Sequence, residues 1–145
     1  MTTQTIVLGA DHAGFTLKEK VRRELLRRGC DVHDATPRFK AGDDYPLAGR
    51  KVAKLVAKDK KSRGIIVCGS GVGVAIAANR IKGIRAMDGH APAEVKLARE
   101  HNDVNVLTLS GWKMSAIAAM KLVDAFLKTP FSNAARHRRR VKQLH

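Results

Sequence analysis

The sequence predicts a single-domain α/β protein, in which a parallel sheet of five strands is covered by helices on both faces. Its 145 residues suit one domain with a core of its own. Short apolar runs rich in β-branched residues alternate with longer runs of helical spacing, and this alternation favours a parallel sheet. One apolar run leads directly into a glycine-rich loop, as at the carboxyl end of a strand in open α/β sheets.

The first half of the chain predicts three strands and two helices. The strands are the apolar or alternating runs 5–9, 30–34 and 63–67. The first helix spans 15–28 and ends before Gly29, which tolerates the left-handed backbone common at a helix end. The second helix spans 46–58 and opens on Pro46, whose fixed backbone angle and missing N–H suit a first helical turn.

The second half of the chain continues the alternation. Strands are expected at 84–87 and 104–109, and helices at 74–79, 91–100 and 115–128. The last long helix stops before Pro130. A short basic helix or arm then closes the domain (1–145) at about 133–145. The alternation does not fix the order of the strands in the sheet.

The net charge of +15 is the strongest bulk feature. Six basic residues lie within 136–142, if His137 is counted. Such charge favours polyanions or phosphate esters as ligands, but does not by itself choose between a nucleic acid and a sugar phosphate. Only 4% of the residues are aromatic and no nucleic-acid-binding motif is present, so nucleic acid is the less favoured partner.

The cysteine content and hydropathy favour a cytoplasmic protein without a membrane partner. Two cysteines are too few for a disulfide framework. No apolar stretch reaches the roughly 18 residues of a membrane span, and residues 1–5 lack the features of a secretory signal.

The most informative segment is 64–73, where an apolar strand ends in Cys68 and the loop Gly-Ser-Gly-Val-Gly follows. Backbone N–H groups at a helix start attract anions and favour a thiolate over a thiol. The loop lacks the third glycine of the dinucleotide fingerprint, where Val74 stands, and the chain has no G-K-[ST] triplet. No histidine pair has metal-ligand spacing. The remaining interpretation is a loop that binds a small anion or an oxyanion and has a cysteine at its entrance.

Six short motifs occur in order along the chain. They are D-H-A-G-F at 11–15, C-G-S-G-V-G at 68–73, A-A-N at 77–79, G-I-R-A at 83–86, H-N-D-V-N-V at 101–106 and R-H-x-x-R-V at 136–141. Together they resemble the type B ribose-5-phosphate isomerase family, which also contains allose- and galactose-6-phosphate isomerases. The resemblance implies a Rossmann-like α/β/α sandwich, a homodimer or homotetramer with active sites between subunits, and aldose–ketose isomerisation of a sugar phosphate without a cofactor or metal.

The resemblance also implies roles for individual residues. Cys68 would be the base that moves a proton between C1 and C2, and His101 would open the sugar ring. Since His101 enters a strand rather than leaving one, it would serve the glycine loop from a neighbouring subunit. Oxygens of the enediolate would be held by Ser70 and by the N–H groups of Gly71, Val72 and Gly73. The remaining substrate contacts would be Asp11, His12, Tyr45, Gly69, Asn102 and Trp112, with Arg136, Arg140 and His137 as a phosphate clamp.

Two positions depart from the family pattern, and the stretch M-D-G-H at 87–90 is unusual for the family as well. Trp112 stands where the family usually has an arginine that contacts the phosphate, and Leu47 stands where a histidine is common. Because an indole carries no charge, we expect ribose 5-phosphate to be a poor substrate and another sugar or sugar phosphate to be preferred. In the alternative, Trp112 packs in the subunit interface. Two rival functions are a sugar-phosphate-binding protein without catalysis and, less favoured, a basic nucleic-acid-binding protein.

Overall fold

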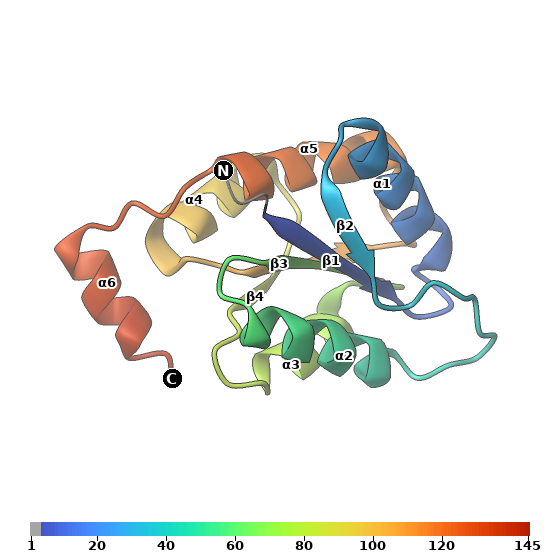
Figure 1. Ribbon diagram of the computed structural model, residues 1–145, viewed down its shortest axis with the longest axis horizontal. Coiled ribbons are helices and arrows are strands. Elements are labelled where there is room, and N and C mark those ends of the chain that lie inside the picture. The colour runs from blue at the N-terminus through green and yellow to red at the C-terminus, as the bar shows by residue number, and fades with distance from the viewer. Residues whose placement is uncertain (1–3) are drawn as a thin grey trace.

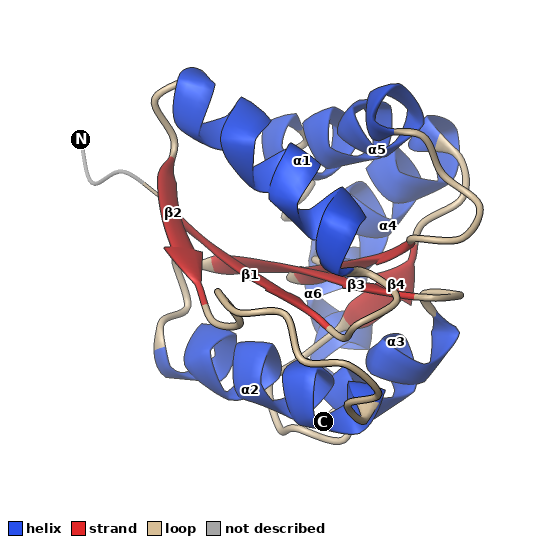
Figure 2. Cartoon of the chain, turned by 90° about the vertical axis from the view of Figure 1, so that its right-hand side faces the viewer, coloured by secondary structure: helices blue, strands red, loops and turns tan. Residues whose placement is uncertain are grey.

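The computed structural model describes residues 4–145, which form a parallel sheet of five strands between two layers of helices (Figures 1 and 2). The strands are β1 (Thr5–Ala10), β2 (Asp31–Asp34), β3 (Arg63–Cys68), β4 (Ala86–Asp88) and β5 (Val106–Ser110). The helices are α1 (Phe15–Arg27), α2 (Tyr45–Lys58), α3 (Val72–Asn79), α4 (Pro92–Asn102), α5 (Ala116–Lys128) and α6 (Ala135–Lys142). The predicted α/β class, the five strands and their parallel direction are confirmed.

The strand order is β2-β1-β3-β5-β4. From β1 the chain moves outward to β2, then returns past β1 to add β3 on its other side. The carboxyl ends of β1 and β3 are therefore neighbours at the point where the direction of winding reverses, with Ala10 paired to Val67. In open α/β sheets, ligands bind in the crevice outside such a reversal point.

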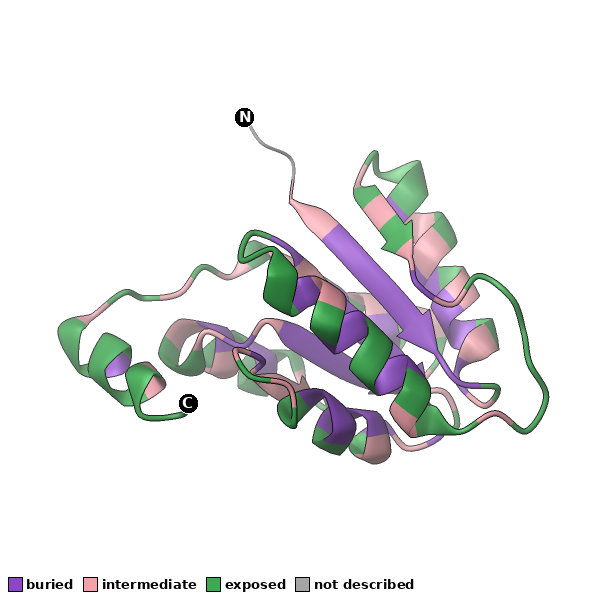
Figure 3. Ribbon diagram, turned by 60° about the horizontal axis from the view of Figure 1, so that its bottom comes forward, coloured by how far each residue is buried: buried purple, intermediate pink, exposed green. Residues whose placement is uncertain are grey.

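Each face of the sheet has its own apolar core. Helices α1, α4 and α5 cover one face and α2 and α3 cover the other, as Figure 2 shows. Alternate residues of β3 serve the two cores: Ile65 and Val67 pack on the first, whereas Ile66 and Cys68 pack on the second. Figure 3 shows the resulting pattern of buried strands beneath helices that are exposed on their outer sides.

Helix α6 lies apart from the two layers, beside the edge of the sheet at which the strands begin (Figure 1). Its contacts are with α4. It carries basic side chains at most positions and buries only His137. The basic arm expected at about 133–145 is therefore a helix, and it stands opposite the edge that carries the glycine loop.

Several element boundaries differ from the prediction. Helix α3 begins at Val72 rather than at 74, directly after Gly71, whose φ of 85° turns the chain. Helix α4 runs to Asn102, so His101 lies in its last turn and not in a connection. Asp103 ends that helix with a φ of 48°, a left-handed backbone that aspartate tolerates better than most residues. No glycine follows the end of α4, so the residue that most often marks a helix end in a sequence is missing here.

One charged side chain is completely buried in the fold. Lys18 of α1 has no exposed surface and bonds to Asp34 of β2 at 2.8 Å and to Glu19 at 2.9 Å. It also donates to the carbonyl of Thr36 at 2.8 Å. Hydrogen bonds from Arg22 and Lys18 lower the pKa of Glu19 to about 2. Lys18 thus connects α1 to the end of β2. Helical periodicity alone predicts an apolar residue at position 18.

Replacing Lys18 by methionine should lower the free energy of unfolding by roughly 3 kcal/mol, because the partly buried carboxylates of Asp34 and Glu19 lose their buried cation and keep only Arg22 as a partner. Urea unfolding at pH 7 measures the loss. Lys20→Met, on an exposed position of the same helix, is the matched control and should change stability by less than about 0.5 kcal/mol. Equal effects of the two substitutions would show that the buried lysine has no structural role.

Candidate active site

The first group of predicted site residues gathers at the carboxyl edge of the sheet. Asp11 follows β1 and Cys68 ends β3, and the backbone N–H of Asp11 donates to the carbonyl of Val67 at 3.3 Å. Gly14 makes the close approach possible, because a Cβ there would lie 2.0 Å from the same carbonyl oxygen. The start of α1 therefore rests on the end of β3 beside the cysteine.

The glycine loop closes around the sulfur of Cys68. This residue is 3% exposed, and its Sγ accepts a hydrogen bond from the N–H of Gly71 at 3.1 Å. The donor points toward the position of thiolate charge, at the start of α3. Ser70 Oγ accepts from the N–H of Val72 at 3.2 Å. The cysteine sulfur therefore lies beside a backbone N–H donor at a helix start, as the sequence predicts.

Hydroxyl groups of β5 hold the loop from behind, and the sequence analysis missed them. Thr108 Oγ1 donates to the carbonyl of Gly71 at 2.7 Å, and Ser110 Oγ donates to that of Gly69 at 2.6 Å. Asp88 of β4 lies 3.3 Å from the same threonine hydroxyl. The sequence does contain a signal for them, because Thr108 and Ser110 place hydroxyl groups two residues apart in an otherwise apolar strand. Residues two apart in a strand lie on the same face of the sheet.

Two aromatic side chains cover glycines of the loop. The ring of Tyr45, at the start of α2, lies 2.4 Å from where a Cβ of Gly73 would stand. The indole of Trp112 lies 2.5 Å from the corresponding point on Gly69 and is 74% exposed. A larger residue at either glycine would displace the aromatic ring. Both predicted contact residues therefore border the cysteine loop.

Asp11 and His12 differ in their surroundings. Asp11 is buried, which raises the pKa of its carboxyl group, while one oxygen accepts from the N–H of Gly14 at 2.9 Å. His12 is on the surface, and its Nδ1 lies 3.0 Å from a carboxylate oxygen of Asp43. That hydrogen bond raises the pKa of His12, so its cation persists to higher pH than in a free imidazole. The sequence analysis did not single out Asp43.

The second group of predicted residues lies at the amino edge of the sheet. His101 and Asn102 end α4, and the His101 ring lies 4.4 Å from that of His137 in α6. Ser132 Oγ is 2.6 Å from Nδ1 of His137. Burial and the charges nearby lower the pKa of His137, which favours its neutral form. The guanidinium groups of Arg136 and Arg140 flank this pair of imidazoles from one helix and are exposed.

The two groups are separated by the length of the sheet. β3 contains six residues, and a strand rises about 3.3 Å per residue, so roughly 20 Å lies between the edges. Cys68 and His101 therefore cannot contact one small substrate within one chain. Each chain carries a cysteine half-site (Asp11, His12, Tyr45, Cys68 and the glycine loop) and a histidine–arginine half-site (His101, Asn102, Arg136, His137, Arg140).

Among residues 4–145, no three His, Cys, Asp or Glu side chains gather as a metal site would require. Within the same range, no helix is long and apolar enough to cross a membrane. Both cysteines are free thiols.

Comparisons with known proteins agree with this geometry. The family model described as Ribose/Galactose Isomerase matches residues 6–144. The ribose-5-phosphate isomerase B of Escherichia coli K12 is 38% identical over 139 residues, which are 96% of this chain and 93% of that protein. The crystal structure of a ribose 5-phosphate isomerase from Thermotoga maritima has a TM-score of 0.93 and 40% identity, covering 99% of this chain and 98% of that one. The crystal structure of the Mycoplasma genitalium ribose-5-phosphate isomerase B with bound ribulose-5-phosphate has a TM-score of 0.92 and 38% identity. The match covers 99% of this chain and 95% of that one.

The hydrogen bond between His12 and Asp43 yields a titration test. Asp43→Asn should lower the pKa of His12 toward its ordinary value of 6.5, because the carboxylate that stabilises the imidazolium is gone. The pKa is read from the imidazole NMR signals between pH 5 and 9. The matched control is Asp44→Asn, since Asp44 is exposed and next in sequence, and it should leave the pKa of His12 where it is. An Asp43→Asn variant that titrates like the wild type would contradict the assigned contact.

Proposed function

Because the chain belongs to the ribose/galactose isomerase family, we propose that it is an aldose–ketose isomerase that interconverts ribose 5-phosphate and ribulose 5-phosphate through an enediolate. The observation that carries this proposal is the cysteine at the end of β3, with the N–H of Gly71 donating to its sulfur at the start of α3. This arrangement pairs a base with stabilisation of an oxyanion.

We propose that the thiolate of Cys68 removes the proton from C2 of the open-chain aldose and returns it to C1. A second proton passes from the C2 hydroxyl to the C1 oxygen, so that C2 becomes the carbonyl carbon of the ketose. The electron pair of the broken C–H bond moves into the C1–C2 bond as the carbonyl oxygen gains negative charge. That oxygen would accept hydrogen bonds from Ser70 and from the N–H groups of Gly71, Val72 and Gly73. Such prearranged donors contribute a few kcal/mol each when they face charge that develops in the transition state.

The complete site is proposed to form between two subunits of a homodimer or larger oligomer. The support is the separation of the half-sites, because ring opening by His101 and proton transfer by Cys68 must act on one sugar. Apolar side chains on the surface offer an interface. On α3, Val72 and Ile76 are 48% and 57% exposed and share one helical face. Leu47 of the adjoining α2 is 57% exposed.

Around the substrate, we assign Asp11, His12 and Tyr45 to the sugar hydroxyls on the cysteine side. The partner subunit would supply His101 to open the ring and Asn102 near the sugar oxygens. We place the protein in the cytoplasm, where reducing conditions keep a catalytic thiol free, as both cysteines are here.

Trp112 is proposed to shape the choice of sugar. Its indole rests on Gly69 and is 74% exposed, so it borders the mouth of the cysteine half-site. An indole offers one donor and an apolar face that can stack on the C–H face of a sugar, but no charge for a phosphate. We propose that a related sugar phosphate is preferred to ribose 5-phosphate for this reason.

The test of the proposed reaction is the conversion of ribose 5-phosphate, followed by the appearance of ribulose 5-phosphate. Cys68→Ala should lower kcat by about 100-fold or more, since the proton would lose its base, while the substrate still binds. Cys30→Ala is the matched control and should retain wild-type turnover. A wild-type protein that binds sugar phosphates but converts none of ribose, allose or galactose phosphates would instead be a binding protein. A Cys68→Ala variant with more than a tenth of the activity would need another base.

The phosphate clamp has its own test. Arg136→Ala and Arg140→Ala should each weaken substrate binding by roughly 1.5–3 kcal/mol, seen as a raised KM, because each removes a charged hydrogen-bond donor. Arg138→Ala is the control, since this side chain is two residues from both arginines, lies on the opposite face of α6 and should leave KM nearly unchanged. Equal losses at all three positions would indicate a diffuse basic surface and favour the nucleic-acid alternative.

A further inference from the structure

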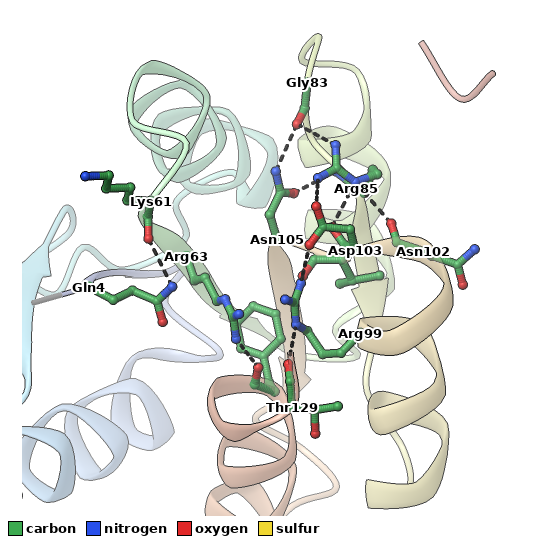
Figure 4. Close-up of polar contacts among 12 residues, drawn as sticks. Gln4, Lys61, Arg63, Gly83, Arg85, Arg99, Asn102, Asp103, Asn105 and Thr129 are labelled. Carbon is green, nitrogen blue, oxygen red and sulfur yellow. Dashed lines mark hydrogen bonds and ion pairs between the residues drawn. The ribbon is translucent and has the colours of Figure 1, made fainter. Parts of the chain in front are cut away.

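A second basic site lies at the amino edge of the sheet, where a cavity of about 720 Å³ opens between the strand starts and the end of the chain. Segments distant in sequence contribute its walls, and Figure 4 shows the polar contacts made by several of the side chains. Six cationic side chains line it: Lys60, Lys61, Arg63, Lys82, Arg85 and Arg99. Asp103 is the one carboxylate in the lining.

Asp103 is already shared by two of these cations. Its Oδ1 lies 2.9 Å from Nη1 of Arg99, and its Oδ2 lies 3.3 Å from Nη2 of Arg85. Carbonyls at the ends of α4 and α5 add partial negative charge, as Arg99 Nε donates to Thr129 O at 3.0 Å. Arg85 and Arg99 therefore have a structural role, because they connect Asp103 to neighbouring carbonyls. No acidic side chain of the lining remains to pair with the other four cations.

Arg63 is the exceptional member of the lining. Its guanidinium is half-buried, donates to the carbonyl of Phe126 and lies 5.4 Å from the centre of that ring. Within residues 4–145 it forms no ion pair, and its Nε and Nη2 have no hydrogen-bond acceptor. Burial, with the nearby charge of Arg99, lowers the pKa of Arg63 to about 10. The free nitrogens of this half-buried cation still reach solvent, and an anion in the cavity would supply the counter-charge that the protein does not.

We propose that this cavity is an anion site, separate from the substrate site, that binds a small phosphate compound with at least two negative groups. The guanidinium of Arg63 would anchor one group through its free Nε and Nη2, as planar guanidinium groups do with phosphate. Lys60, Lys61 and Lys82 are exposed at the rim and would reach a second group. No Phe, Tyr or Trp side chain lines the cavity, and the imidazole of His145 is its one aromatic ring, so a phosphate group fits the lining better than a nucleotide base does.

The site differs from the proposed phosphate clamp in its residues. The clamp uses Arg136 and Arg140 of α6, neither of which lines the cavity. The two sites are linked through Val141, which follows Arg140 in α6 and lines the cavity, and through Arg85, whose Nε donates to the carbonyl of Asn102 at 3.1 Å. Binding in the cavity is therefore separable from substrate binding by mutation.

Pyrophosphate is the probe, titrated calorimetrically into the full-length protein at about 0.15 M salt, where exposed charges are screened. Arg63→Met should weaken binding at least tenfold, because methionine keeps the packing on Phe126 without the charge. The double variant Lys60→Gln with Lys82→Gln, at exposed positions that tolerate substitution, should weaken it severalfold. Arg23→Gln, an exposed arginine of α1 outside the cavity, is the matched control and should bind pyrophosphate as the wild type does. Arg136→Ala tests the clamp and should lower the affinity for pyrophosphate less than Arg63→Met does.

Four results would overturn the proposal. The first is a wild-type protein that shows no binding at millimolar pyrophosphate. The second is unchanged affinity in both the folded Arg63→Met variant and the double lysine variant. The third is a loss with Arg23→Gln or Arg136→Ala as large as that with Arg63→Met, which would mean diffuse charge or binding at the clamp. The fourth is equal affinity for citrate, which would show that the cavity does not select phosphate.

Discussion

The parallel direction of all five strands is the constraint on which the rest of the structure depends. It delivers every segment that follows a strand to one edge of the sheet and every segment that precedes one to the other. The glycine loop and Asp11 follow strands, whereas His101 precedes β5, so the sheet itself holds them about 20 Å apart. The separation of the two groups of predicted residues follows from this topology, and it is the support for the proposal that a second chain completes the site.

At the carboxyl edge, close backbone packing positions Cys68 and the glycine loop. Gly14 lets the start of α1 touch the end of β3, and hydroxyl groups of Thr108 and Ser110 fix two carbonyls of the glycine loop. With those carbonyls held, the N–H of Gly71 is directed at the sulfur of Cys68 and that of Val72 at the hydroxyl of Ser70. If Cys68 is the base, as we propose, a site held in this way would need little rearrangement when charge develops on the substrate.

The sequence predicted the elements and the cysteine loop because both leave local signals, namely apolar period, glycine and motif. It did not predict the strand order, which depends on how βαβ units pack. The stop of α4 at Asn102 lacks a glycine signal, and buried Lys18 occupies a position that helical period assigns to an apolar residue. The basic cavity was missed as well, since residues from 60 to 105 meet there only through tertiary folding.

Subunit mixing tests the shared site most directly. Cys68→Ala and His101→Ala chains, each inactive alone, are unfolded together, refolded as a mixture and assayed for isomerisation. Random pairing of dimers gives half mixed dimers, each with one intact site of two, so about a quarter of wild-type activity should return. The mass of the mixed dimer verifies the exchange. No recovery in a mixture that contains mixed dimers would contradict the account and place both residues in one chain's site.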